Sequence, residues 1–228
     1  VRAAMAGMQD LSVHARVPHS VGTNRPSRTL PALACDSHMH IFDARFAPSP
    51  HWPRTPPDAP VAAYRQLQQR LGTSRTVVVT PSTYGTDNAC TLDALDQLGD
   101  SARGVAVVDA EVDDRQLAEL AARRVRGLRV NFVSPQSWGT TTPEMLATLA
   151  GKVARHADCA GWHIQVFAQP EQIVALAPSR IVYVACDPAA LARDIAYLAK
   201  DGYELESVRA FDLFPMTHHV ECVAVLTR

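Results

Sequence analysis

The stretch RGLRVNF at residues 126–132 predicts a β-strand, and it is followed by the helical stretch TPEMLATLAGKVARH at 142–156 and by a second strand, WHIQVF, at 162–167. Thr142 predicts a helix cap, and Pro143 suits the first helical turn, where an amide hydrogen is not needed. A strand, a helix and a further strand in this order return the chain in the same direction. The stretch therefore predicts a parallel sheet covered by helices.

The same alternation extends over most of the chain. Further strands are predicted at 36–42, 76–80, 104–109 and 180–185, and further helices at 61–71, 90–98, 114–124, 170–176 and 188–200. Six strand–helix units in series predict an α/β fold of parallel βα repeats, either a partial (β/α)8 TIM-like barrel or an open doubly wound sheet. The last two predicted strands, Tyr203–Phe211 and Val220–Thr227, have only a loop between them, which predicts an antiparallel pair. Eight predicted strands in total leave open a barrel-like closure.

The composition excludes several classes of protein. The chain has 228 residues, of which 47% are hydrophobic, and its formal net charge of −1 excludes a broadly basic nucleic-acid binder. No apolar run reaches the length of a membrane span, so no membrane partner is expected. Five scattered cysteines without a CxxC motif predict free thiols in a reducing, cytoplasmic compartment. The sequence contains no G-x-G, so neither a dinucleotide-binding loop nor a P-loop is expected and no cofactor is predicted.

The N-terminal residues 1–34 differ in composition from the rest. They carry four arginines against one acidic residue, with no apolar core of a secretory signal. We expect them to form a flexible tail that precedes the first strand.

Polar side chains recur on one face of the predicted strands. Residues two apart share a face of a strand, and the resulting polar set is Asp36, His38, His40, Thr80, Ser82, Arg129, Asn131, His163 and Gln165. The active sites of parallel α/β folds lie at the carboxyl ends of the strands. We therefore expect a functional site where these side chains converge.

The His38-x-His40 pair is the sharpest local signal in this set. Two imidazoles on one face of a strand could ligate a metal or converge on an anionic substrate, or they could be two structural histidines. Two histidines without a third ligand do not predict a metal site.

Four segments together resemble the first half of an amidohydrolase-superfamily TIM barrel. They are CDSHMHIFD (35–43), TPSTYGTDN (80–88), RGLRVN (126–131) and GWHIQV (161–166). The resemblance covers residues 35–178 and is nearest to the metal-independent branch that includes 2-pyrone-4,6-dicarboxylate lactonase. It implies hydrolysis of a small cyclic ester, often a polycarboxylate.

This resemblance implies roles for six residues. His38 and His40 would polarise the lactone carbonyl or position the substrate, and Ser82, Tyr84 and Arg129 would bind substrate carboxylates. His163 is a further substrate-binding candidate. Arg129 could equally form an internal salt bridge.

The same family has catalytic residues in its second half that do not match here. A strand-end histidine, usually within an Asp-His pair, and a late aspartate that acts as general base are expected, but no Asp-His pair follows residue 170. Asp212 is the only late strand aspartate, and we do not assign it this role. Hydrolysis needs a base for water, so impaired activity is expected.

Residues 179–228 resemble the C-terminal end of SAM-dependent RNA uracil-5-methyltransferases. The resemblance rests on RIVYVACDPAALARD (180–194) and FDLFPMTHHVE (211–221). It implies that Cys186 attacks the uracil ring and that Glu221 removes the proton after methyl transfer. S-adenosylmethionine and RNA are implied only in this alternative. The glycine loop that binds SAM is missing, and the segment's net charge of −2 does not suit a phosphate backbone.

The two resemblances together predict a chimera joined near 178–181. The first hypothesis is a lactonase-like hydrolase of small carboxylates or lactones, with impaired activity. The alternatives are an RNA uracil-5-methyltransferase remnant and a non-functional fusion fragment. A half barrel exposes sheet edges, which predicts self-association.

Overall fold

The computed structural model describes residues 25–228 except 28, 53, 55, 57, 133–141 and 212–219. The described residues form two compact units, divided between Phe167 and Ala168. Most of the expected N-terminal tail lies outside the described residues, as does Asp212. No helix among the described residues is long and apolar enough to cross a bilayer.

The first unit is a run of strands and helices in strict alternation. Its strands are β1 (Cys35–Met39), β2 (Arg75–Val79), β3 (Ala102–Ala106), β4 (Val125–Asn131) and β5 (His163–Phe167), and its helices are α1 (Val61–Leu71), α2 (Ala89–Leu98), α3 (Asp114–Ala122) and α4 (Pro143–Arg155). Its described residues also include three short 3-10 turns: η1 (Ser82–Tyr84), η2 (Gly99–Ser101) and η4 (Ala157–Cys159). The predicted elements of this unit are confirmed to within two residues at nearly every end.

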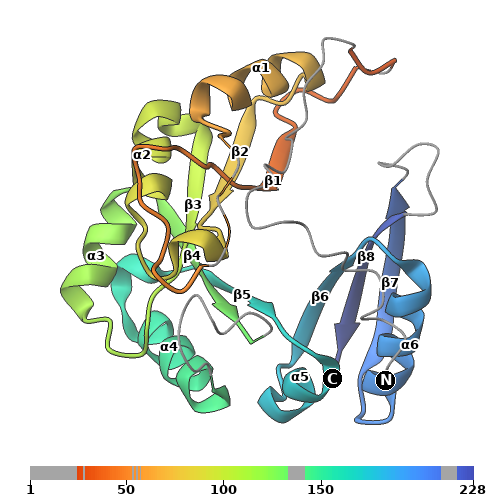
Figure 1. Cartoon of the computed structure of the whole chain (residues 1–228). Helices are drawn as coiled ribbons and strands as arrows, with labels where there is room; N and C mark the ends of the chain where they lie inside the picture. The colour runs from red at the N-terminus through yellow and green to blue at the C-terminus, as the bar shows by residue number, and fades with distance from the viewer. Residues whose placement is uncertain are drawn as a thin grey trace. The chain divides into compact units, whose positions relative to one another are not determined.

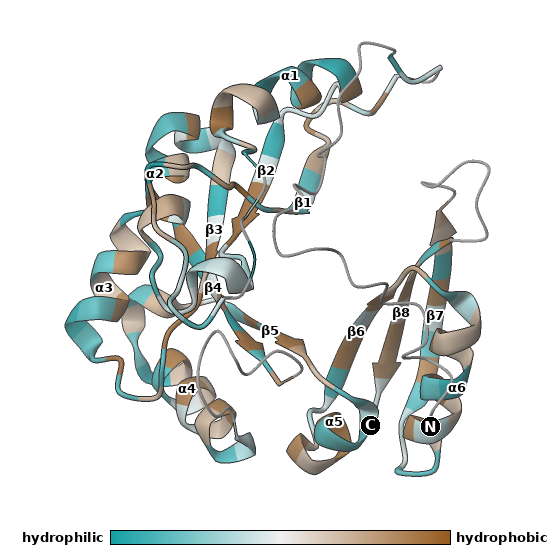
Figure 2. Cartoon of the chain, viewed as in Figure 1, coloured by the Kyte–Doolittle hydropathy of each residue, from teal (hydrophilic) through white to brown (hydrophobic). Residues whose placement is uncertain are grey.

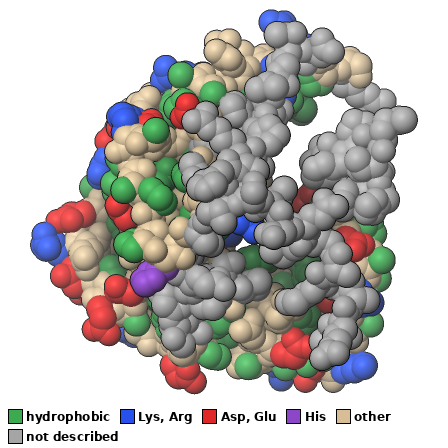
Figure 3. Space-filling view, in the orientation of Figure 1, with side chains coloured by type: hydrophobic (Ala, Val, Ile, Leu, Met, Phe, Trp, Pro, Cys, Tyr) green, Lys and Arg blue, Asp and Glu red, His purple; other side chains and the backbone are tan. Residues whose placement is uncertain are grey.

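The five strands form one parallel sheet in sequence order. Helices α1 to α4 all lie on one side of it, as in half of a barrel wall (Figure 1). The buried apolar side chains of β2 to β4, such as Val78, Leu128 and Val130, lie between sheet and helices. Acidic and basic side chains are interspersed over the outer surface of these helices (Figure 3). The expected parallel half-barrel is confirmed.

Local sequence signals explain where the helices begin. Thr142 caps α4 by accepting the Met145 N–H at 3.2 Å, followed by a proline at the first helical position, as predicted. Asp113 and Gln116 form a capping box at the start of α3. In the second unit, Asp187 accepts two backbone N–H groups at the start of its longer helix.

The second unit is a smaller α/β layer. It consists of α5 (Pro170–Leu176), β6 (Arg180–Ala185), α6 (Pro188–Ala199), β7 (Glu204–Phe211) and β8 (Glu221–Thr227). Its three-stranded sheet has the order β6-β8-β7, and both pairs are antiparallel. The predicted antiparallel ending is therefore confirmed.

Two expectations about the sheets are wrong. β6 does not continue the parallel series but pairs with β8 in the opposite direction, and the described strands form two sheets instead of one eight-stranded closure. The sequence of β6 specifies a strand with apolar residues on both faces. It carries no information about the direction of its partner.

One face of the second sheet packs on its helices. Leu191 and Leu198 of α6 contact a buried cluster with Tyr203, Ala224 and Leu226. The strands β6 and β8 are the most hydrophobic part of this unit (Figure 2). On the opposite face of this sheet, Val182 and Val184 of β6 are largely exposed. Within this unit, helices therefore cover only one side of the sheet.

Candidate active site

The predicted histidine pair lies at the carboxyl end of β1. The ring centroids of His38 and His40 are 5.1 Å apart in an edge-to-face arrangement. His40 Nδ1 lies 2.8 Å from the carbonyl oxygen of Val79, the last residue of β2. Because a carbonyl only accepts, Nδ1 carries the proton and Nε2 presents its lone pair.

Both imidazoles are neutral at pH 7. Burial lowers the pKa of His40 to about 4, and the positive charge of Arg129 adds to this effect. Loss of solvation, followed by the charge of Arg129, also lowers the pKa of His38. A neutral His40 with Nδ1 engaged presents an acceptor at Nε2. Its expected role in polarising the lactone carbonyl or positioning the substrate stays a prediction.

Arg129 on β4 is the cation of this site. Burial lowers the pKa of its guanidinium, which nonetheless stays protonated near neutral pH. Its Nη1 is buried and has no hydrogen-bond partner within the described part of the chain. Gln165 is its neighbour in the β4–β5 register, and its Oε1 is likewise buried without a partner there. A buried guanidinium nitrogen without a partner among the described residues is a costly arrangement that an anionic ligand would relieve.

Ser82 and Tyr84 follow β2 on the 3-10 turn η1. Asn131, the last residue of β4, donates from Nδ2 to Ser82 Oγ at 3.1 Å. Ser82 thus lies at the same sheet edge as the histidines. Tyr84 is buried, only 2% exposed, and its hydroxyl accepts the Asp43 N–H at 3.1 Å. This geometry gives Tyr84 a structural contact with the loop after β1.

Asn88 is a residue of this edge that the sequence analysis did not single out. Its Nδ2 donates to the carbonyl of Val107 at 2.7 Å, and its Oδ1 accepts the N–H of the same residue at 2.9 Å. Thr80 Oγ1 donates to Asn88 Oδ1 at 2.8 Å. Asparagine just before a helix indicates a cap, but here the side chain joins the β2–α2 loop to the end of β3.

His163 does not join the other candidates. It is the first residue of β5 and pairs with Gly127, whereas the site lies at the carboxyl ends of the strands. A Cβ at Gly127 would lie 2.7 Å from His163 Cε1, so the ring packs directly on the glycine backbone. The expectation that His163 lies near a carboxyl strand end is wrong, and Gln165 takes that position.

The donor set does not fit a bound metal ion. Within the described ranges, no group of three or more His, Cys, Asp or Glu side chains converges. Catalytic zinc sites use three protein ligands, whereas this edge offers two imidazoles beside a cationic guanidinium. We derive no step through a metal.

Cys186 and Glu221 lie next to a paired position of the second sheet. Ala185 of β6, the residue before Cys186, pairs with Cys222 of β8, the residue after Glu221. Cys186 is exposed, and Glu221 is half-buried and also pairs with Phe211 of β7. Residues 212–219 of the second methyltransferase-like motif lie outside the described residues.

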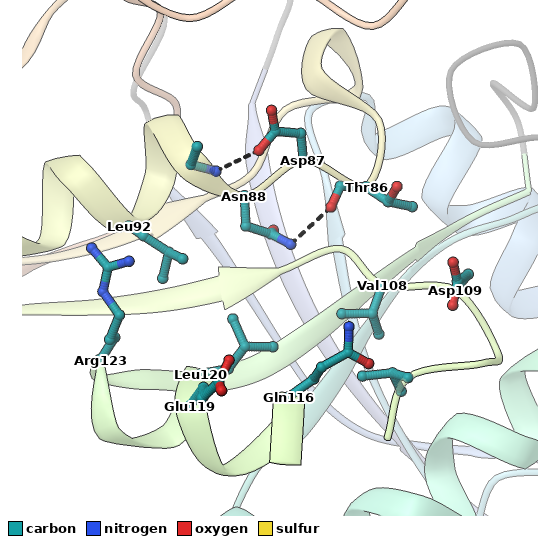
Figure 4. A pocket seen from close by; sticks show the side chains of 12 residues that line it. Thr86, Asp87, Asn88, Leu92, Val108, Asp109, Gln116, Glu119, Leu120 and Arg123 are labelled. Carbon is teal, nitrogen blue, oxygen red and sulfur yellow. Dashed lines mark hydrogen bonds between the residues drawn. The ribbon is translucent and has the colours of Figure 1, made fainter. Parts of the chain in front are cut away.

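A separate pocket of about 480 Å³ lies between α2 and α3 (Figure 4). Its floor is apolar, with Leu92, Val108 and Leu120, and its rim carries Asp87, Asp109 and Glu119 among other side chains. None of the eight predicted site residues lines it. It shares Asn88 with the sheet edge described above but does not include the histidine pair.

Comparison with known families agrees with this fold. Residues 35–197, more than half of the chain, match the family described as amidohydrolase, and the chain belongs to this family. Residues 171–228 match the family described as tRNA (uracil-5-)-methyltransferase. The two matches overlap over 171–197, which spans α5, β6 and most of α6. The expected chimeric character is thus confirmed.

Individual relatives divide in the same way. A 2-pyrone-4,6-dicarboxylate hydrolase of Comamonas testosteroni is 36% identical over 146 residues, which are 63% of this chain and 46% of that protein. A 4-sulfomuconolactone hydrolase of Rhizobium radiobacter is 33% identical over 127 residues, 55% of this chain and 42% of that protein. An uncharacterised RNA methyltransferase of Streptomyces avermitilis is 66% identical over 56 residues, 25% of this chain and 13% of that protein. The chain thus spans less than half the length of each of these relatives.

Solved structures support the fold. An apo structure from Agrobacterium tumefaciens has a TM-score of 0.56 at 24% identity and covers 66% of this chain and 53% of its own. A probable 2-pyrone-4,6-dicarboxylic acid hydrolase of Acinetobacter baumannii, with citric acid bound, has a TM-score of 0.52 at 25% identity. The match covers 63% of this chain and 52% of that chain. The first unit is therefore half of an amidohydrolase barrel.

Proposed function

We propose that the first unit binds a small carboxylated lactone at the carboxyl edge of its sheet and hydrolyses it slowly. The observation that carries this proposal is the buried Nη1 of Arg129, which has no partner among the described residues and lies near two neutral histidines. A guanidinium in a water-poor site favours a carboxylate strongly. The lactone hydrolases among the relatives support the choice of ligand class.

In this proposal, Arg129 and Ser82 hold the carboxylate while the lactone carbonyl faces the histidines. Water attacks the carbonyl carbon, the ring ester bond breaks, and the water proton passes through a base to the leaving oxygen. In this proposal His40 Nε2 accepts that proton, but a base with a pKa of about 4 accepts it poorly near neutral pH. This is the reason to expect impaired turnover.

The test is binding and turnover of 2-pyrone-4,6-dicarboxylate by the full chain. We expect calorimetric binding and slow ring opening, with binding weakened at least about tenfold in Arg129→Met, because a charged hydrogen bond is lost. The matched control is Arg115→Met, which removes a cation from the exposed surface of α3. Absence of binding, or equal binding by Arg129→Met and the parent chain, would refute the proposal and favour a non-functional fragment.

A second candidate function rests on the pairing of Ala185 with Cys222, the neighbours of Cys186 and Glu221 at the ends of β6 and β8. We propose that Cys186 and Glu221 are a retained catalytic pair of an RNA uracil-5-methyltransferase, with Cys186 as nucleophile and Glu221 as base. Calorimetry with S-adenosylmethionine tests whether the chain binds the methyl donor. Binding would support the activity, and no binding would remove it.

A further inference from the structure

The outer edge of β5 lacks the charged side chains that usually protect a sheet edge. β5 pairs with β4 on one side, and no described strand pairs with its other side. The other edge strands of the two sheets carry charges that disfavour pairing with a further strand: Asp36 on β1, Arg180 on β6, and Glu204, Glu206 and Arg209 on β7. β5, with the sequence HIQVF, has no Asp, Glu, Lys or Arg.

The backbone groups available at this edge are defined by the pairing on the inner side. The carbonyl of Phe167 accepts the Phe132 N–H at 2.8 Å, so Phe167 directs its backbone groups toward β4. Because alternate residues of a parallel strand bond to the same neighbour, Ile164 and Val166 direct theirs to the open edge. Two residues therefore remain to pair with an added strand.

From this geometry we infer that the chain forms a two-fold dimer in which β5 pairs antiparallel with β5 of a second copy. The symmetric register centred on Gln165 uses both open residues, because it places Ile164 opposite Val166 of the second copy. The two residues then exchange N–H···O bonds, once on each side of the axis. A two-fold pairing of identical edges gives a closed dimer, whereas pairing of two different edges would add further copies without end.

The side chains of β5 are complementary to themselves in this register. Ile164 and Val166 form β-branched cross-strand pairs on one face. On the other face, Gln165 lies opposite its own copy. His163 lies opposite Phe167, a residue that is 49% exposed in the single chain. The register thus covers an exposed aromatic residue.

The first test is the association state of the full chain by sedimentation or light scattering. We expect a dimer that Gln165→Glu weakens at least about tenfold, because two carboxylates would face each other across the axis. Within one copy the new carboxylate lies beside Arg129, which favours the folded monomer. The matched control is Ser37→Glu on the opposite edge strand β1, which should leave the dimer intact. A monomeric parent chain, or a dimer that Gln165→Glu leaves unchanged, would overturn the inference.

The second test does not depend on how Gln165→Glu folds. In the proposed register, the Cα atoms of residue 165 and its copy lie about 4.5 Å apart, within the range of a disulfide. Gln165→Cys should therefore form a 165–165 bridge on mild oxidation. Ile164→Cys is the control, since its Cα would lie about 8 Å from its copy. Peptide mapping separates this bridge from those of the exposed Cys35 and Cys186, and failure of Gln165→Cys to cross-link would reject the pairing.

Discussion

Asn88 binds both backbone groups of Val107, donating to its carbonyl at 2.7 Å and accepting its N–H at 2.9 Å. Val107 is buried immediately after β3, so the side chain extends the sheet where the strand ends. Asn88→Ala leaves two buried backbone groups without a partner, and we expect it to lower the free energy of unfolding by about 2–3 kcal/mol in urea titrations. Gln97→Ala, which removes an exposed amide of the same helix, should change it by less than about 0.5 kcal/mol. Equal effects of the two variants would contradict a structural role for Asn88.

The buried His40 makes stability depend on pH in a defined window. Its pKa falls from 6.5 to about 4 in the folded chain, so the unfolded chain binds more protons between these values. The neutral His40 therefore contributes up to about 3 kcal/mol to the free energy of unfolding. This contribution is complete above about pH 6.5 and is lost as the pH falls toward 4. His40→Gln should remove this part of the slope when unfolding free energies are measured across the window. Parallel pH profiles of the two proteins would show that His40 is not buried as described.

Arg129 illustrates a conflict between stability and binding. Its guanidinium is buried with Nη1 unpaired in the described part of the chain, and replacing such a charge with an apolar side chain of similar size often stabilises a protein. We expect Arg129→Met to raise the unfolding free energy by about 1–2 kcal/mol in the same titrations that show lost ligand binding. A destabilised Arg129→Met would indicate instead that the guanidinium supports the sheet.

Gly127 is required by the close approach of β5. An added Cβ would lie 2.7 Å from His163 Cε1 and 2.9 Å from the backbone oxygen of His163. Gly127→Ala should therefore cost about 1–3 kcal/mol of unfolding free energy. Gly151→Ala is the contrasting variant, because it lies within α4 and its Cβ would meet only the flexible end of Arg155, and it should be neutral or slightly stabilising. Similar stability losses in both variants would contradict the assigned packing.

The two units have separate cores. Leu128 is fully buried in the first unit and Leu226 in the second, each with no exposed surface. Truncation of either leucine to alanine should cost about 2–5 kcal/mol in its own unit. Hydrogen exchange should show the loss of protection in β2 to β4 for Leu128→Ala and in β6 to β8 for Leu226→Ala. Loss of protection throughout the chain in both variants would show instead that the units unfold together.

Sequence periodicity was sufficient to locate the helices and strands, because apolar spacing and caps are local properties. It also placed His38, Arg129 and Gln165 on one face of the sheet, since alternation along a strand is local as well. Partner direction is not local, which is why β6 was assigned to the parallel sheet and was found antiparallel to β8.

The end of a strand at which a residue lies was also hard to predict. The pattern WHIQVF shows which residues share a face, but the position of His163 at the amino end becomes clear only from its pairing with Gly127. Asn88 was missed because its partners are the backbone groups of a distant residue, Val107, and the sequence gives no signal for them. The roles assigned to the histidines, Ser82, Tyr84, Cys186 and Glu221 stay predictions.

The strand order of the two sheets has a consequence for synthesis of the protein. In the first unit each strand pairs with the one made before it, so the sheet can grow as the chain leaves the ribosome. In the second unit β8 lies between β6 and β7, which do not pair with each other. β6, which is largely apolar, and β7 therefore stay unpaired until the last strand is synthesised, at about 5–20 residues per second. During that interval the nascent chain is a candidate for chaperone capture, and a translational pause before Glu221 would lengthen it.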